Sequence, residues 1–112
     1  MDRSQYTTLI SDILYRLSES YIDPTREDVQ TELVIDNKHG NYMLLDIGWT
    51  PDERVRRQFV YVRLKNGKFW IEEDWTEDGI VTYLEEAGVP NQDIVLAFNP
   101  PELRPYTNYA IA

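Results

Sequence analysis

The densest group of chemically competent side chains is a run of acids in the second half of the chain. Within WIEEDWTEDG at 70–79 the acids are Glu72, Glu73, Asp74, Glu77 and Asp78. Glu72 and Asp74 have the spacing that puts two side chains on the same face of a strand, and paired carboxylates can bind a hard cation or share acid–base work. However, a solvated strand end followed by a helix start collects acids for solubility and for the helix dipole alone. We favour this structural interpretation over a metal or catalytic site.

Other catalytic and metal-binding signatures are missing from the sequence. His39 is the only histidine, which rules out a two-histidine metal motif, and no serine or aspartate stands at a recognisable triad spacing from it. The chain has no cysteine, so thiol catalysis and thiolate metal sites are excluded. Its glycines never cluster into a phosphate-cradling loop. We therefore expect no enzymatic activity, no cofactor and no bound metal.

A second group mixes cations with aromatic rings. It contains Arg54, Arg56, Arg57, Arg63, Lys65 and Lys68, interleaved with Phe59, Tyr61, Phe69 and Trp70. In composition this resembles a nucleic-acid-binding β-ribbon. Arg63 opposite Trp70 is more economically explained as a cross-strand cation–π pair. We favour a protein contact here and keep direct DNA binding as an alternative.

The charge balance supports the protein contact. The chain has 20 acids against 11 Lys and Arg residues, a formal net charge of −9, and a DNA duplex repels such a chain. The charges are also segregated, because six of the 11 basic residues lie at 54–68 and seven acids lie at 72–86. Such a bipolar molecule suits docking to another protein, and direct nucleic-acid binding is not expected.

The pair Asn66-Gly67 predicts the β-hairpin that would position both groups. Asn-Gly accepts the two positive φ angles of a type I′ turn. A two-residue loop then pairs Lys65 with Lys68, Leu64 with Phe69, Arg63 with Trp70, Val62 with Ile71, and Tyr61 with Glu72. One face of this hairpin carries Val60, Val62, Leu64, Phe69 and Ile71, which predicts a core. The other carries Phe59, Tyr61, Arg63, Trp70, Glu72 and Asp74.

The rest of the chain predicts helices and strands around this hairpin. Apolar residues at three- and four-residue spacing predict a helix from about Ser4 to Ser20, capped by Asp2 or Ser4 and ended before Asp23-Pro24. Two strands with alternating apolar residues follow, joined by a turn at 37–41. One face of the first strand carries Val29, Thr31, Leu33 and Ile35. One face of the second carries Met43, Leu45, Ile47 and Trp49. A third strand runs from about Arg54 to Lys65. Thr76 is expected to cap a second helix that Gly88 ends, and the run at 94–98 predicts a buried strand.

Together these elements predict one α+β domain spanning residues 1–112. The predicted architecture is an N-terminal helix, an antiparallel β-meander of about four strands, a second helix, a short C-terminal strand and a tail. The aromatic tail, with Tyr106, Tyr109 and Ile111, is expected to pack back on the sheet, and a homodimer contact is the second interpretation. No apolar run is long enough to span a membrane, and no signal peptide is recognisable, so we expect a cytoplasmic protein without membrane contact.

Several strings resemble the XisI family. They are WIEEDWTEDGI at 70–80, GVPNQDIVLAFNPPELRPYT at 88–107, YAIA at 109–112 and, upstream, ELVIDNKHGNYMLLDIGW at 32–49. The resemblance covers essentially the whole chain; it departs at Asn99, where many members have histidine, and at Trp75, where glycine is common. These small cyanobacterial proteins are associated with programmed excision of the fdxN DNA element during heterocyst differentiation. They act there beside a site-specific recombinase, and commonly beside a neighbour-encoded XisH protein that resembles nucleases.

The resemblance implies an accessory factor that controls excision by binding a XisH-like protein, a site-specific recombinase, or both. We expect the interface to include Arg57, Tyr61, Arg63, Trp70, Glu72, Asp74, Glu77 and Asp78. Either the basic and aromatic residues meet an acidic partner, or the acids meet a basic DNA-binding surface. In the second case the chain could act as an antitoxin-like inhibitor of a XisH-type nuclease.

Overall fold

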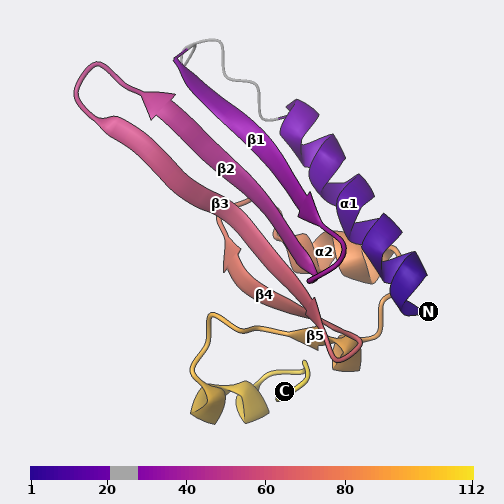
Figure 1. Ribbon diagram of the computed structural model, residues 1–112. Coiled ribbons are helices and arrows are strands. Elements are labelled where there is room, and N and C mark those ends of the chain that lie inside the picture. Colours follow the sequence, from indigo (N-terminus) through magenta and orange to yellow (C-terminus); the bar gives the residue numbers. More distant parts are fainter. Residues whose placement is uncertain (21–27) are drawn as a thin grey trace.

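The computed structural model describes residues 1–20 and 28–112 (Figure 1). In chain order the elements are helix α1 (Arg3–Ser20), strands β1 (Val29–Asp36), β2 (Asn41–Trp49), β3 (Arg54–Lys65) and β4 (Lys68–Asp74), helix α2 (Ile80–Glu86), a 3₁₀ turn (Asn91–Asp93), strand β5 (Ile94–Val95) and a 3₁₀ segment (Pro101–Tyr106). This order confirms the predicted α+β architecture. The helix stop predicted at Asp23-Pro24 lies outside the described residues.

The strands form one sheet in the order β1-β2-β3-β4-β5. The first four are antiparallel neighbours, as predicted, whereas β5 runs parallel to β4. Parallel neighbours need a crossover connection, and α2 supplies it. The strand predicted over 94–98 is shorter than expected, because the chain turns after Val95 and the amide of Ala97 donates back to the Val95 carbonyl at 3.0 Å.

Helix α1 begins with a reciprocal cap and packs on the sheet through the predicted apolar face. The Asp2 carboxylate accepts from the Gln5 amide at 2.9 Å, and the Gln5 side chain accepts from the Asp2 amide at 2.8 Å, which is a capping box. The buried residues of the helix are Tyr6, Ile10, Ile13, Leu14 and Leu17. They form one core with the inward side chains of β2, β3, β4 and α2.

The hairpin β3–β4 has the predicted turn, with φ of 55° at Asn66 and 74° at Gly67. The register is as predicted from Lys65–Lys68 to Val62–Ile71, but Tyr61 pairs with Glu73 and not with Glu72. The reason is a β-bulge between Tyr61 and Val62, which shifts the pairing by one residue.

A second bulge, between β2 and β3 at Leu44/Leu45, also changes the predicted faces. Phe59, expected on the solvated face, is only 8% exposed and belongs to the core. Strand pairing of Asp74 with Val60 likewise moves Asp74 off the face of Tyr61 and Trp70. Sequence alternation alone could not reveal either change, because a bulge reverses the parity of every residue beyond it.

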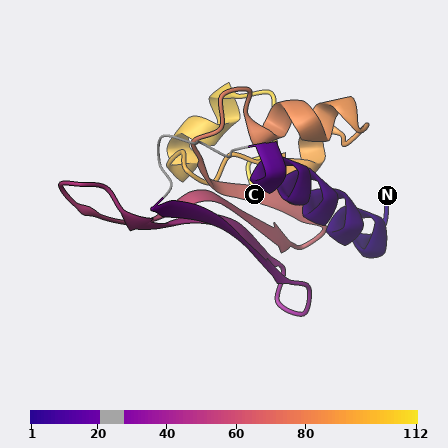
Figure 2. The ribbon, with the colours of Figure 1, turned by 90° about the horizontal axis from the view of Figure 1, so that it is seen from above.

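The sheet has one covered and one open side. Figure 2 shows α1 and α2 on the same side of β1, β2 and β3, and neither helix on the other side. On β2, the residues that face the covered side are buried; they are Tyr42, Leu44 and Asp46. The predicted set Met43, Leu45, Ile47 and Trp49 does share a face, and that face is the open one.

Tyr6 links α1 to the 3₁₀ turn, and its ionisation should lower the stability of the fold at alkaline pH. Its side chain is 1% exposed and its hydroxyl donates to the Asp93 carboxylate at 2.5 Å. Burial, followed by this hydrogen bond and the charge of Asp93, raises the pKa of Tyr6 from 10.0 to about 12. Because the folded value is the higher one, stability is full below pH 10 and is lost as pH rises through 12. Two pKa units correspond to a full loss of roughly 2.7 kcal/mol.

Urea unfolding below pH 10 and near pH 12 measures this loss. Tyr6→Phe should reduce the difference between the two conditions, at a cost of about 1 kcal/mol for the missing hydrogen bond. Burial also raises the pKa of Tyr42, and the hydrogen bond to Glu85 raises that of Tyr109, so part of the alkaline slope persists. Tyr106→Phe, which removes the hydroxyl of an 88% exposed residue, is the control and should leave the free energy of unfolding within about 0.5 kcal/mol of the parent value. An equal slope in Tyr6→Phe and the parent protein would contradict the assignment.

Candidate functional site

An acidic and aromatic surface lies where β4 ends and the chain enters α2. We define this acidic edge as Glu73, Trp75, Glu77, Asp78 and Phe98. Trp75 is 62% exposed and its indole N–H donates to the Glu73 carboxylate at 2.9 Å. Phe98 is 56% exposed and its amide donates to the carbonyl of Ile71, in the middle of β4, at 3.2 Å, so the segment after β5 continues alongside β4. Glu77 and Asp78 are exposed in the intervening loop.

The turn that precedes α2 fixes the position of this edge. Asp74 Oδ1 accepts from the amide and hydroxyl of Thr76 at 2.9 and 2.6 Å, and Oδ2 accepts from the Ile80 amide at 2.7 Å. Asp74 therefore serves the turn and the first residue of the helix, and its oxygens point into the protein. The interface role of Asp74 stays a prediction, and these hydrogen bonds give the residue a structural role in the turn.

Thr76 does not cap the helix directly, contrary to the prediction. Its hydroxyl accepts from the Gly79 amide at 3.0 Å, and α2 begins at Ile80. Glu77 and Asp78 consequently precede the helix in an exposed loop, not in its first turn. The Asp78 carboxylate accepts from the Tyr83 hydroxyl at 3.0 Å, which ties the loop to the helix.

The predicted basic and aromatic residues are divided between the two sides of the sheet. Tyr61, Arg63 and Trp70 lie on the side away from the core. Arg57 pairs with Asp46 on the covered side, where its Nε lies 3.4 Å from the carboxylate. That carboxylate is 7% exposed and also accepts from the Thr31 hydroxyl at 2.9 Å. Arg57 thus compensates a buried charge and does not join the other three.

Trp70 makes cation–π contacts with residues other than the predicted Arg63. Its ring lies 5.1 Å from Lys65 Nζ and 5.6 Å from the Arg104 guanidinium carbon, and its indole N–H donates to the Lys65 carbonyl at 3.1 Å. Arg63 reaches Glu72 at 3.9 Å. Arg63 and Trp70 are cross-strand neighbours as predicted, but the cation–π contacts of Trp70 are with Lys65 and Arg104, and the latter holds the C-terminal segment on β4.

Arg104 and Tyr109 anchor the tail. The Arg104 guanidinium donates to the carbonyls of Ala97, Asn99 and Ile111. Tyr109 donates to the Glu85 carboxylate and packs against the core, which confirms the predicted self-packing for that residue. Tyr106 and Ile111 are 88% and 57% exposed, so the prediction fails for these two.

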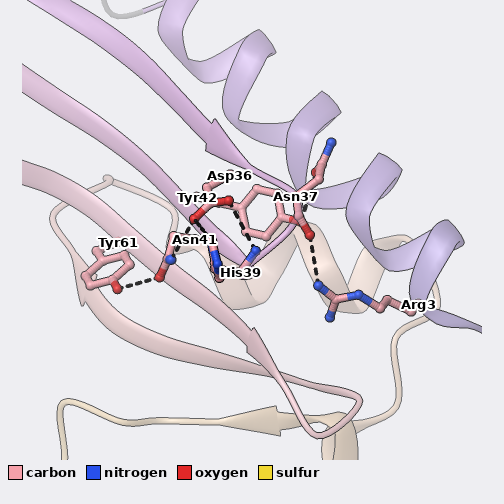
Figure 3. Close-up of polar contacts among 7 residues, drawn as sticks. All are labelled: Arg3, Asp36, Asn37, His39, Asn41, Tyr42 and Tyr61. Carbon is pink, nitrogen blue, oxygen red and sulfur yellow. Dashed lines mark hydrogen bonds and ion pairs between the residues drawn. The ribbon is translucent and has the colours of Figure 1, made fainter.

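The β1–β2 turn holds a polar network around the only histidine (Figure 3). Asp36 accepts from the His39 amide at 3.1 Å and from the Asn41 side chain at 3.1 Å, and His39 Nδ1 lies 3.2 Å from it. These hydrogen bonds, that of Asn41 foremost, lower the pKa of Asp36. Asn41 in turn accepts from the Tyr61 hydroxyl at 2.7 Å. The network fixes the turn, so His39 has the ordinary exposed role that the sequence suggested.

Neither a metal cluster nor a membrane-spanning helix is found within residues 1–20 and 28–112. No three His, Cys, Asp or Glu side chains in this part of the chain converge on a point that could hold an ion. No helix described here has the length and apolar character to cross a bilayer. Sequence reasoning missed Trp75 and Phe98 as surface residues; the signal for Trp75 was its place inside an acidic run, whereas Phe98 sits in a string that reads as a buried strand.

Comparisons with known proteins agree with this fold. A XisI-like protein from Anabaena variabilis superposes with a TM-score of 0.91 at 29% sequence identity, over 99% of this chain and 100% of that one. The fdxN element excision controlling factor XisI from the same organism superposes with a TM-score of 0.86 at 35% identity, with the same coverage. A search of curated protein sequences finds no match. The sequence model of the XisI protein family matches residues 1–111, and the chain therefore belongs to the XisI family.

Proposed function

We propose that this chain is a non-enzymatic controlling factor for excision of a DNA element, and that it acts by binding a XisH-like protein or a recombinase through the acidic edge. The role in excision is supported by the name of the structural neighbour, an fdxN element excision controlling factor. The mode of action is supported by one observation above all. Exposed acids, Glu77 and Asp78, flank an indole that is 62% exposed.

This combination suits a basic protein surface. Carboxylates at the rim of an interface steer a positively charged partner and set its orientation, while a large aromatic side chain supplies binding energy when it is buried. A surface that binds DNA is basic, so an acidic protein can occupy it in place of the phosphates. Occupation of a nuclease or recombinase groove in this way would restrain cutting, as an antitoxin-like inhibitor does.

The test is co-expression with the neighbour-encoded XisH-like protein, followed by size-exclusion chromatography and a salt titration of the dissociation constant. Glu77→Gln combined with Asp78→Asn removes both charges and keeps an acceptor for the Tyr83 hydroxyl. We expect about tenfold weaker binding and a shallower salt dependence. The matched control is Asp12→Asn with Glu19→Gln, which removes two exposed charges from α1.

Trp75→Ala should weaken the same complex more strongly, by about 2 kcal/mol, if the indole is a central anchor. Equal binding by the charge-neutralised protein and its α1 control would contradict the acidic edge as the site. Separate elution of the two proteins, followed by retardation of a DNA duplex by this chain at low salt, would move the function to direct DNA contact.

A further inference from the structure

The open side of the sheet carries an apolar strip along β2, the strand between β1 and β3. Met43, Leu45, Ile47 and Trp49 alternate with the buried residues of β2, so they face away from the side on which Figure 2 shows α1 and α2. Ile47 is 37% and Trp49 58% exposed. A row of apolar side chains along one strand of an open sheet face favours burial against a second surface.

Charges of opposite sign flank this strip. On β1, Glu32 pairs across to Leu45 and Asp36 to Asn41, so both acids lie on the open side beside the strip. On β3, Arg56 pairs with Ile47 and Arg63 with Asn41, so these cations lie along the other flank. Glu32 and Arg56 are exposed, and the Arg63 side chain is 41% exposed.

This pattern is complementary to itself. A two-fold axis in the interface, parallel to β2, superimposes the β2 strip on its own copy and exchanges β1 with β3. The strand pairing puts residues 36, 41 and 63 in one row and residues 34, 43 and 61 in the next. The rotation therefore lays Asp36 over the Arg63 position of the second copy, and Val34 over the Tyr61 position. Glu32 of one copy then lies beside the row of the second copy that holds Arg56.

We propose that the open face binds a second copy of this chain, sheet against sheet, with the dyad along β2. The charges choose between the two simple arrangements. A dyad perpendicular to the strands would set β1 on β1 and β3 on β3, which brings acids near acids and arginines near arginines, and such contacts cost several kcal/mol. The parallel dyad gives opposite charges on both flanks and an apolar centre, the usual distribution of a stable interface. Glu77 and Asp78 of the acidic edge follow β4 and lie outside the strands of this face, whereas Glu73 pairs with Tyr61 and borders it.

The experiment measures the molecular mass of the full chain by light scattering and sedimentation equilibrium over a range of concentrations. Four charge variants are compared with the parent: Glu32→Lys, Arg56→Glu, the double variant with both changes, and Glu19→Lys on α1 as control. All three substituted positions are exposed, so folding should be unaffected, and circular dichroism checks this.

We expect a concentration-dependent dimer, a dissociation constant raised about tenfold in each single variant, and recovery in the double variant because the charges are then exchanged but still opposite. Leu45→Asp, in the apolar strip, should give a monomer. A parent protein that is monomeric at all concentrations overturns the proposal. A dimer that persists in Leu45→Asp also overturns it, because that dimer would form through another face. A double variant whose affinity does not recover overturns it as well, because the two-fold axis would then not pair β1 with β3.

Discussion

Gly40→Ala is expected to destabilise the protein by about 3 kcal/mol. Gly40 ends the β1–β2 turn with φ of +71°, where a Cβ costs about 1 kcal/mol or more in itself. An added Cβ would also lie 2.4 Å from the carbonyl oxygen of Leu64, in the backbone of β3. That strand is held in place by the hydrogen bond from the Leu64 amide to the Gly40 carbonyl, at 2.9 Å. Relieving the overlap must therefore shift a central strand, which adds about 1–3 kcal/mol.

Gly67→Ala is the matched control for this prediction. Gly67 has φ of +74°, nearly the same backbone conformation, but no atom of residues 1–20 and 28–112 lies within 4 Å of its added Cβ. It should lose only the conformational cost, about 1–2 kcal/mol. Urea unfolding measures both, and the midpoint should fall further for Gly40→Ala at an unchanged m-value. Equal shifts in the two variants would show that the contact with β3 carries no energy.

The two glycines also show what sequence reasoning can reach. Asn66-Gly67 predicts its own turn, because the requirement for positive φ is local, and the register follows as far as Val62–Ile71. Gly40 is recognisable as a turn residue, but its contact with Leu64 joins residues far apart in the chain. The bulges beside Tyr61 and Leu44 depend on how three strands pair with one another, so no local sequence pattern predicts them.

The candidate site divides in the same way. The acidic run is visible in the sequence and keeps its surface position at Glu77 and Asp78. Asp74 is indistinguishable from its neighbours in composition, and only the fold reveals that it accepts three hydrogen bonds at the start of α2. Arg57 was grouped with Arg63 on composition, whereas the bulge in β3 turns it to the buried Asp46.

Phe69→Ala is the second large effect, a loss of about 3–5 kcal/mol. Phe69 is fully buried on β4, and its ring lies 4.6 Å from that of Tyr6 between centroids, at an interplanar angle of 42°. Its strand neighbour is Ile94 of β5. Truncation removes the contact that joins α1, β4 and β5, and leaves a cavity that a five-stranded sheet cannot close. Chemical denaturation should show the loss, which is a large part of the total stability of a domain this size.

Phe98→Ala makes the same chemical change at the acidic edge. It should leave the stability of the fold nearly unchanged and weaken the binding of the partner. Phe98 is 56% exposed, so its removal should alter the free energy of unfolding by about 0.5 kcal/mol or less. If the acidic edge binds the XisH-like partner, the same substitution should weaken that complex about tenfold, because an exposed ring of this surface is buried only on binding. Phe69→Ala, assayed at a temperature where it is still folded, should bind the partner as the parent protein does. A Phe98 variant that binds normally would restrict the interface to Trp75 and the acids, whereas a variant that unfolds early would mean that the ring supports the fold and not the partner.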